Sequence, residues 1–287
     1  MDNKYIFIII LFSIMLMAPF LIYMSQELKR TYKKEVQKGI ARNAKAENNI
    51  LTEKDIHHLP KPVQKYLNYV GVIGKEKVQN VKVTVDGEMK MDPKKGWVKI
   101  KAEQYNFFDS LPTRLFYMGV KMSGIPVLGL HSYTAEEATM KIKVAGLITV
   151  VNTTGPEMRI SDTTTLFNDM CFFAPATLID HRIKWESIDD LTVKATFNAY
   201  DCQVSALLYF NDKGELIRFV SEDRYYLSMD GSCKRVRWST PIGNYQERNG
   251  LRLATYGEAI WSLPEGEYCY AKFTDIKEVK YNSDAIS

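Results

Sequence analysis

The chain has 287 residues, of which 46% are hydrophobic and 25% are charged, and this composition excludes a disordered or low-complexity protein. The formal net charge of +4 comes mostly from basic residues between Lys29 and Lys45, directly after the first hydrophobic run. This position is typical of a segment next to a membrane and argues against a nucleic-acid partner.

The N-terminal region predicts a single membrane-spanning helix. From Tyr5 to Met24 no residue is charged, and a run of this length is what a helix needs to cross a bilayer. A cleaved signal peptide is the alternative, but Tyr23 and Met24 stand where its small residues belong. We therefore expect an uncleaved anchor over residues 1–25. The basic residues that follow favour a cytoplasmic domain, whereas the fold analogy given below favours the other side, so the topology stays open.

Residues 26–57 are rich in Lys, Glu, Ala and Asn, which predicts a solvated helical stalk next to the membrane. Contact between its basic face and anionic lipids is the functional alternative. A single β-rich domain is expected over residues 58–287. It opens with a short amphipathic helix that begins near Pro62 and ends at Gly71.

Apolar residues then repeat with a period of two, as in Val81–Val85, Val98–Ala102 and Met140–Val144, where lysines stand between several of them. This pattern predicts strands with one wet and one dry face, and the lysine-lined face excludes a membrane-spanning barrel. A strongly apolar stretch over 162–180, broken by Pro175, predicts helical pieces that cover the dry face, with Thr and Asp residues before it as helix caps.

Strands resume at Leu191 and continue to the C-terminal region. The predicted fold class is therefore α+β: a curved, mainly antiparallel, half-barrel-like β-sheet with a helical plug, preceded by one transmembrane helix.

The sequence contains no phosphate-binding glycine loop, nucleophile-elbow serine, calcium loop or zinc-binding histidine pair, so no catalytic residue and no cofactor is predicted. Adjacent His57 and His58 would point to different sides of a helix, and the four cysteines stand far apart, so no metal site is expected. We expect the cysteines to be small buried residues, although disulfides stay open. Asp223 beside Arg224 is the strongest candidate for chemistry, and a structural salt bridge is the favoured interpretation.

Aromatic side chains are expected on the concave face of a curved sheet, where they could enclose an apolar cavity. A filled core is the equally weighted alternative. The predicted ligand-binding residues are Phe116, Met118, Phe172, Phe173, Trp185, Trp238 and Trp261.

The opening Leu59–Val72, with the sequence LPKPVQKYLNYVGV, resembles that of an uncharacterised bacterial family, a domain of unknown function often found with membrane segments. Further matches extend to Gly257–Trp261 and Tyr281, with departures at Phe173, where relatives carry Trp, and at 253–254. The resemblance implies no activity. The order of helices and strands is also similar to the half-barrels of bacterial lipoprotein carriers, which hold acyl chains in an apolar concavity.

These observations favour a membrane-anchored, non-catalytic binding module for a lipid or another apolar ligand, with the lipid bilayer as its partner. A scaffold protein of an envelope complex and an unrecognised hydrolase that uses Asp223 are the alternatives. No nucleic acid is expected, and the sequence predicts no particular protein partner.

Overall fold

The computed structural model describes residues 17, 19–43, 49–228 and 232–286. The helices are α2 (Glu27–Asn43), α3 (Glu53–Ile56), α4 (Lys61–Val70), α5 (Pro156–Phe172) and the 3-10 helix η1 (Pro175–Ile179). The strands are β1 (Asn80–Met89), β2 (Val98–Phe107), β3 (Thr113–Met122), β4 (Ile125–Tyr133), β5 (Ala138–Val144), β6 (Ile148–Thr154), β7 (Ile183–Ser187), β8 (Thr192–Ala199), β9 (Cys202–Phe210), β10 (Leu216–Ser221), β11 (Tyr225–Leu227), β12 (Cys233–Arg235), β13 (Trp238–Arg248), β14 (Leu251–Leu263) and β15 (Gly266–Tyr281).

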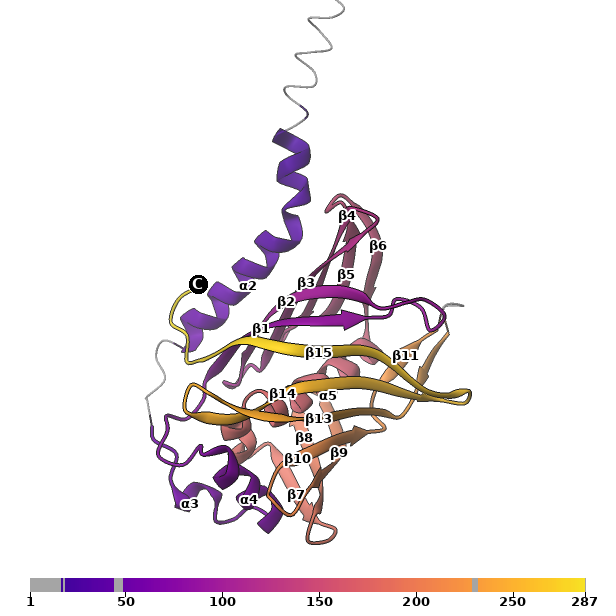
Figure 1. Ribbon diagram of the computed structural model, residues 1–287. Helices are drawn as coiled ribbons and strands as arrows, with labels where there is room; N and C mark the ends of the chain where they lie inside the picture. Colours follow the sequence, from indigo (N-terminus) through magenta and orange to yellow (C-terminus); the bar gives the residue numbers. More distant parts are fainter. Residues whose placement is uncertain (1–16, 18, 44–48, 229–231, 287) are drawn as a thin grey trace, which may run out of the picture.

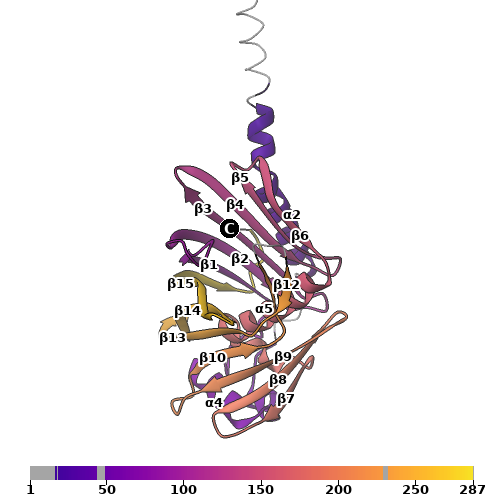
Figure 2. The same cartoon turned by 90° about the vertical axis from the view of Figure 1, so that its right-hand side faces the viewer.

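Within the described residues, 13 strands form one antiparallel sheet in the order β6-β5-β4-β3-β2-β1-β15-β14-β13-β10-β9-β8-β7. The strands β11 and β12 form a separate hairpin. The sheet curls around α5, which lies inside the curve, while α2 crosses the outer face of β2, β3 and β4 (Figures 1 and 2). The predicted curved antiparallel sheet with a helical plug is confirmed.

The two faces of the sheet follow from the alternation of side chains along each strand. On β2, Tyr105 and Phe107 point to the outer face and pack against α2, while Gln104 and Asn106 point inward and contact α5. Both faces of this part of the sheet are therefore covered by helices.

Helix α2 packs tightly on the outer face, so the expected solvated stalk is wrong. Leu28, Tyr32, Val36 and Ile40 recur every four residues and are buried against the sheet. At Gly39 the helix comes so close that a Cβ atom would lie 2.4 Å from the Phe107 ring. These four residues form a narrow apolar stripe on a helix that is otherwise rich in lysine. The overall composition of the segment therefore indicates a solvated helix although one face is buried.

The predicted membrane span is Tyr5–Met24. Its residues 5–16 and 18 lie outside the described part of the chain. Residues 19–25 are helical and lead into α2. Among the helices that the structure describes, none is long and apolar enough to cross a membrane.

Helix α5 begins at Pro156, after Gly155 in the left-handed φ region (122°), and so starts earlier than predicted. Asp162 and its threonine neighbours are therefore not caps but lie buried within the helix. Here the hydroxyls of Thr163 and Thr165 donate to the carbonyls of Arg159 and Ser161 one turn earlier, which satisfies them inside the helix. Polar residues of α5 consequently face the interior of the sheet.

Candidate functional site

A cavity of about 280 Å³ lies between α5 and the concave face of the sheet. Its walls come from β1–β5 on one side and from β13–β15 on the other, and the segment between β10 and β11 contributes one residue. The lining residues are Met89, Met91, Ile100, Arg114, Phe116, Met118, His131, Met140, Ile142, Asp162, Thr165, Asn168, Asp169, Arg224, Trp238, Thr240, Gly257, Glu258, Ala259, Trp261, Tyr270, Ala271 and Phe273. Interiors rarely leave voids larger than a water molecule, so a space of this size is more than a packing defect.

Much of the lining is apolar and adaptable. Met89, Met91, Met118 and Met140 all line the cavity, and methionine side chains adjust readily to guests of irregular shape. Met91 is 39% exposed, which places the approach from solvent at the end of β1. The methionines therefore form a flexible wall that leads from the surface into the interior.

A buried charge network forms part of the cavity floor. The Asp169 Oδ2 atom accepts hydrogen bonds from Arg114 Nε at 2.7 Å, Gln104 Nε2 at 2.8 Å and Asn106 Nδ2 at 3.2 Å. Burial raises the pKa of the Asp169 carboxyl, and the guanidinium of Arg114 opposes this shift by favouring the ionised form. These hydrogen bonds join α5 to β2 and β3. Because the groups satisfy one another's hydrogen-bonding capacity, we interpret the network as structural.

Five other polar side chains of the lining each carry a buried atom without a hydrogen-bond partner. These atoms are His131 Nδ1, Asp162 Oδ2, Arg224 Nε, Trp238 Nε1 and Thr240 Oγ1. Within this group, His131 Nδ1 lies 3.6 Å from Asp162 Oδ1, which is too long for a good hydrogen bond. Buried polar atoms are normally satisfied, so their concentration around one cavity marks it as a candidate binding site.

Arg224 reaches the cavity because the predicted strand over 216–226 breaks before it. The break is held by α5, whose Thr164 hydroxyl donates to Asp223 O at 2.8 Å and whose Ser161 hydroxyl accepts from Tyr225 N at 3.0 Å. The guanidinium then lies 4.3 Å from the ring centre of Trp238 and 5.2 Å from that of Trp261. Cation–π contacts of this kind hold the side chain in place without using up its N–H donors.

Of the seven predicted ligand-binding residues, Phe116, Met118, Trp238 and Trp261 line the cavity. The other three lie elsewhere. Phe172 and Phe173 stack on each other at 4.2 Å and pack as core, with the Phe172 ring 3.0 Å from where a Cβ of Gly257 would be. Trp185 lies on the edge strand β7, apart from the cavity. Binding by any of the seven stays a prediction.

The polar lining residues His131, Asp162, Asp169 and Thr240 were not predicted. Asp162 is among the residues that the sequence predicts as helix caps. A run of polar residues in the first half of α5 is the sequence signal for Asp162. His131 on β4 and Thr240 on β13 carry no such signal, because the contacts that unite the four residues link distant segments.

Asp223 is not part of the cavity lining. Its Oδ2 accepts from Ser205 N at 2.7 Å and its Oδ1 lies 3.2 Å from Arg235, so its ion-pair partner is Arg235 and not the neighbouring Arg224. Asp223 thus forms a salt bridge, as the favoured interpretation predicts, but with Arg235 instead of Arg224.

All four cysteines are free thiols. Cys171 is buried, Cys202 and Cys269 are half-buried and Cys233 is exposed, so the expected burial holds fully for Cys171 alone. Burial raises the pKa of Cys269 to about 11, which keeps its thiol protonated near neutral pH. Among the described residues, no group of three His, Cys, Asp or Glu side chains is arranged to hold a metal ion.

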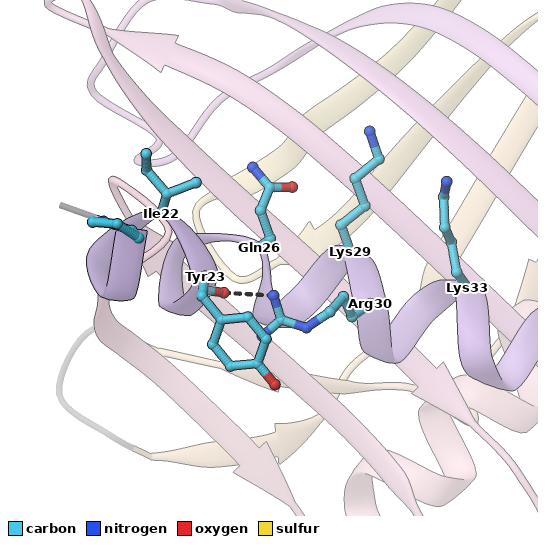
Figure 3. A pocket seen from close by; sticks show the side chains of 7 residues that line it. Ile22, Tyr23, Gln26, Lys29, Arg30 and Lys33 are labelled. Atoms are coloured by element: carbon cyan, nitrogen blue, oxygen red, sulfur yellow. Dashed lines mark hydrogen bonds between the residues drawn. The ribbon is translucent and has the colours of Figure 1, made fainter. Parts of the chain in front are cut away.

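A second hollow follows the N-terminal helical segment and is lined by Pro19, Ile22, Tyr23, Gln26, Lys29, Arg30 and Lys33. Figure 3 shows Lys29 and Lys33 extending from one side of the helix, while Arg30 folds back over the Tyr23 ring at 3.7 Å. All of its lining residues come from one stretch of chain, so this hollow is an open basic surface and not an enclosed site.

The fold and the cavity define a curved β-sheet protein with an internal space of ligand size. Residues 49–273 match the family described as "Family of unknown function (DUF6544)", and the chain belongs to this family. The predicted membership of a family without known function is thereby confirmed. None of the curated proteins matches the chain.

Three solved structures are similar to the chain at low identity. A DUF1329 family protein from Desulfovibrio piger has 11% identity and a TM-score of 0.40, with 77% of this chain and 91% of that chain covered. An outer membrane lipoprotein-sorting protein domain from Vibrio parahaemolyticus has 9% identity and a TM-score of 0.34, with 72% and 87% covered. A LolA superfamily protein from Nitrosomonas europaea has 11% identity and a TM-score of 0.32, with 77% and 91% covered.

Proposed function

We propose that this protein is a non-catalytic binding module that takes a single apolar chain into the cavity between α5 and the sheet. The observation that carries the proposal is the cavity itself, an unfilled space of about 280 Å³ with a methionine-rich wall. At about 30 Å³ for each water-sized group, this space holds on the order of nine such groups. A methylene group is similar in size, so the cavity suits a chain of about ten carbons.

The energetics favour such a guest. Burying a chain of about ten carbons yields on the order of 8 kcal/mol, at about 0.8 kcal/mol per CH₂, before the costs of association. No catalytic group is required, and the volume lies just below the range of about 300–1,000 Å³ that is usual for ligand sites. These magnitudes support a single medium-length chain more strongly than a multi-chain lipid.

The function is tested with methionine-methyl NMR on the full-length protein titrated with decanoate. We expect the methyl signals of Met89, Met118 and Met140 to shift, because these side chains line the cavity. The signal of Met158, which lies at the start of α5 outside the cavity lining, serves as the internal control. If a saturating concentration of decanoate leaves the methyl signals of the three cavity methionines unchanged, the proposal is contradicted.

We further propose that the N-terminal hydrophobic segment tethers the module to a bilayer. Two hairpin tips support this proposal, because Met122 and Ile125 of the β3–β4 hairpin and Ile148 and Val150 of β6 are exposed large hydrophobic residues. A Cβ at Gly146, in the β5–β6 turn, would lie 2.4 Å from Ser25 O, so this turn touches the chain that leaves the hydrophobic segment. The apolar tips thus lie at the end of the domain where the segment emerges.

The tether predicts that alkaline carbonate leaves the full-length protein in the membrane pellet, because a spanning helix is not held by charge. Release into the supernatant would contradict the tether and leave the cavity proposal untouched.

A further inference from the structure

Arg224 is an unpaired cation at the polar end of the cavity. Its Nη1 donates to Tyr270 Oη at 3.2 Å and its Nε has no partner. Among the described residues, no carboxylate lies within the 4.0 Å ion-pair limit of this guanidinium. A half-buried guanidinium that contacts two indole rings and one phenol is therefore open to an anion.

Among the described residues, none of the carboxylates in this part of the protein forms an ion pair with Arg224. Asp223 forms an ion pair with Arg235 at 3.2 Å, and Asp169 forms one with Arg114 at 2.7 Å. Glu258 accepts from the Tyr256 hydroxyl and lies 3.9 Å from Lys272. Asp162 faces His131 at 3.6 Å across the same cavity. The protein itself therefore supplies no direct counter-ion to Arg224 among the described residues.

Two further donors stand beside Arg224 without acceptors. Trp238 and Thr240 occupy positions i and i+2 of β13, so their side chains lie on the same face of the strand. They are 3% and 4% exposed, and Trp238 Nε1 and Thr240 Oγ1 both lack partners. Because Arg224 lies directly over the Trp238 ring, all three donors belong to one corner of the cavity.

We propose that Arg224, Trp238 and Thr240 bind the carboxylate of an apolar acid whose chain occupies the methionine-lined part of the cavity. The inference rests on the proposed function and adds the chemical class of the ligand. A carboxylate offers two oxygens, which can accept from Arg224 Nε and Trp238 Nε1 in charge-assisted and neutral hydrogen bonds. A phosphate monoester would bring nearly two charges close to Asp162, which favours the singly charged carboxylate.

Calorimetry on the full-length protein in amphipol, at about pH 8 where a carboxylic acid is ionised, compares decanoate with decanol. We expect decanoate to bind about tenfold more tightly than decanol, as a charge-assisted contact predicts. Arg224→Gln should lower the affinity for decanoate about tenfold and leave that for decanol unchanged. The matched control is Arg237→Gln, since Arg237 is an exposed arginine near the same hairpin and pairs with Glu222.

Equal binding of decanoate and decanol to the native protein would mean that ordered water satisfies the three donors, and the carboxylate inference would be overturned while the proposed function stands. If neither decanoate nor decanol binds, both the carboxylate inference and the proposed function are overturned. If Arg224→Gln does not fold, Thr240→Val replaces the unpartnered hydroxyl of Thr240 by a methyl group of similar size. We expect this variant to weaken decanoate alone, and unchanged decanoate binding would count against the assignment.

Discussion

Replacing Asp169 with Ala is expected to lower the free energy of unfolding by about 3–5 kcal/mol, because it leaves the buried guanidinium of Arg114 without its counter-ion. Arg114 is 7% exposed and Asp169 3% exposed, so water cannot replace the lost carboxylate cheaply. Gln104 and Asn106 would lose an acceptor as well. Urea unfolding followed by circular dichroism measures the change.

Two comparisons make this result specific. Glu35→Ala removes a partner of the exposed Lys38 on α2 and should change the free energy of unfolding by less than about 0.5 kcal/mol. The double change Arg114→Leu with Asp169→Leu should recover part of the loss, since apolar replacement of a buried ion pair is often neutral, while Gln104 and Asn106 still lack their acceptor. If Asp169→Ala lowers the free energy of unfolding by less than about 1 kcal/mol, the network does not stabilise the packing of α5 on the sheet.

Replacing Ala271 with Phe is expected to abolish binding of decanoate while the protein stays folded. Ala271 lines the cavity from β15 opposite Ala259 of β14, and a benzyl group there would occupy the space proposed for the ligand. Filling an existing void is often stabilising by about 0.5–2 kcal/mol, so the melting temperature should hold or rise. We expect an affinity loss of about tenfold or more, measured by the methionine-methyl titration.

The matched control is Ala135→Phe, which adds the same group to an exposed position between β4 and β5. This variant should bind decanoate as the native protein does. Undiminished binding to a stably folded Ala271→Phe variant would place the ligand somewhere other than the cavity.

Much of the sheet could be predicted because alternation is a local property. The apolar and charged residues of β1, β2 and β5 show the period of two directly, and the apolar stretch ending at Phe173 indicates the plug. The strand β4 was not predicted, since Pro126 and Gly129 interrupt its pattern. At Gly129 a Cβ would lie 2.8 Å from the Met118 methyl group, so this glycine is needed for a contact with the neighbouring strand that no local pattern reveals.

The candidate site was predicted only in its apolar part. Trp238 and Trp261 could be assigned to the concave face by residue type, because large aromatic residues are usually buried there. Arg224 enters the cavity only because the strand breaks after Ser221 and α5 holds the break through Ser161 and Thr164. Such long-range contacts decide which polar groups converge, and a single sequence carries no trace of them.

Diffraction from crystals grown with 10-bromodecanoate gives the most direct test of the central claim, that the space between α5 and the sheet accepts an apolar guest. The account predicts anomalous density for bromine within that space, beside Met89, Met118 and Met140, with the carboxylate toward Arg224. Density confined to the outer surface, or an interior closed by the protein's own side chains, would contradict it.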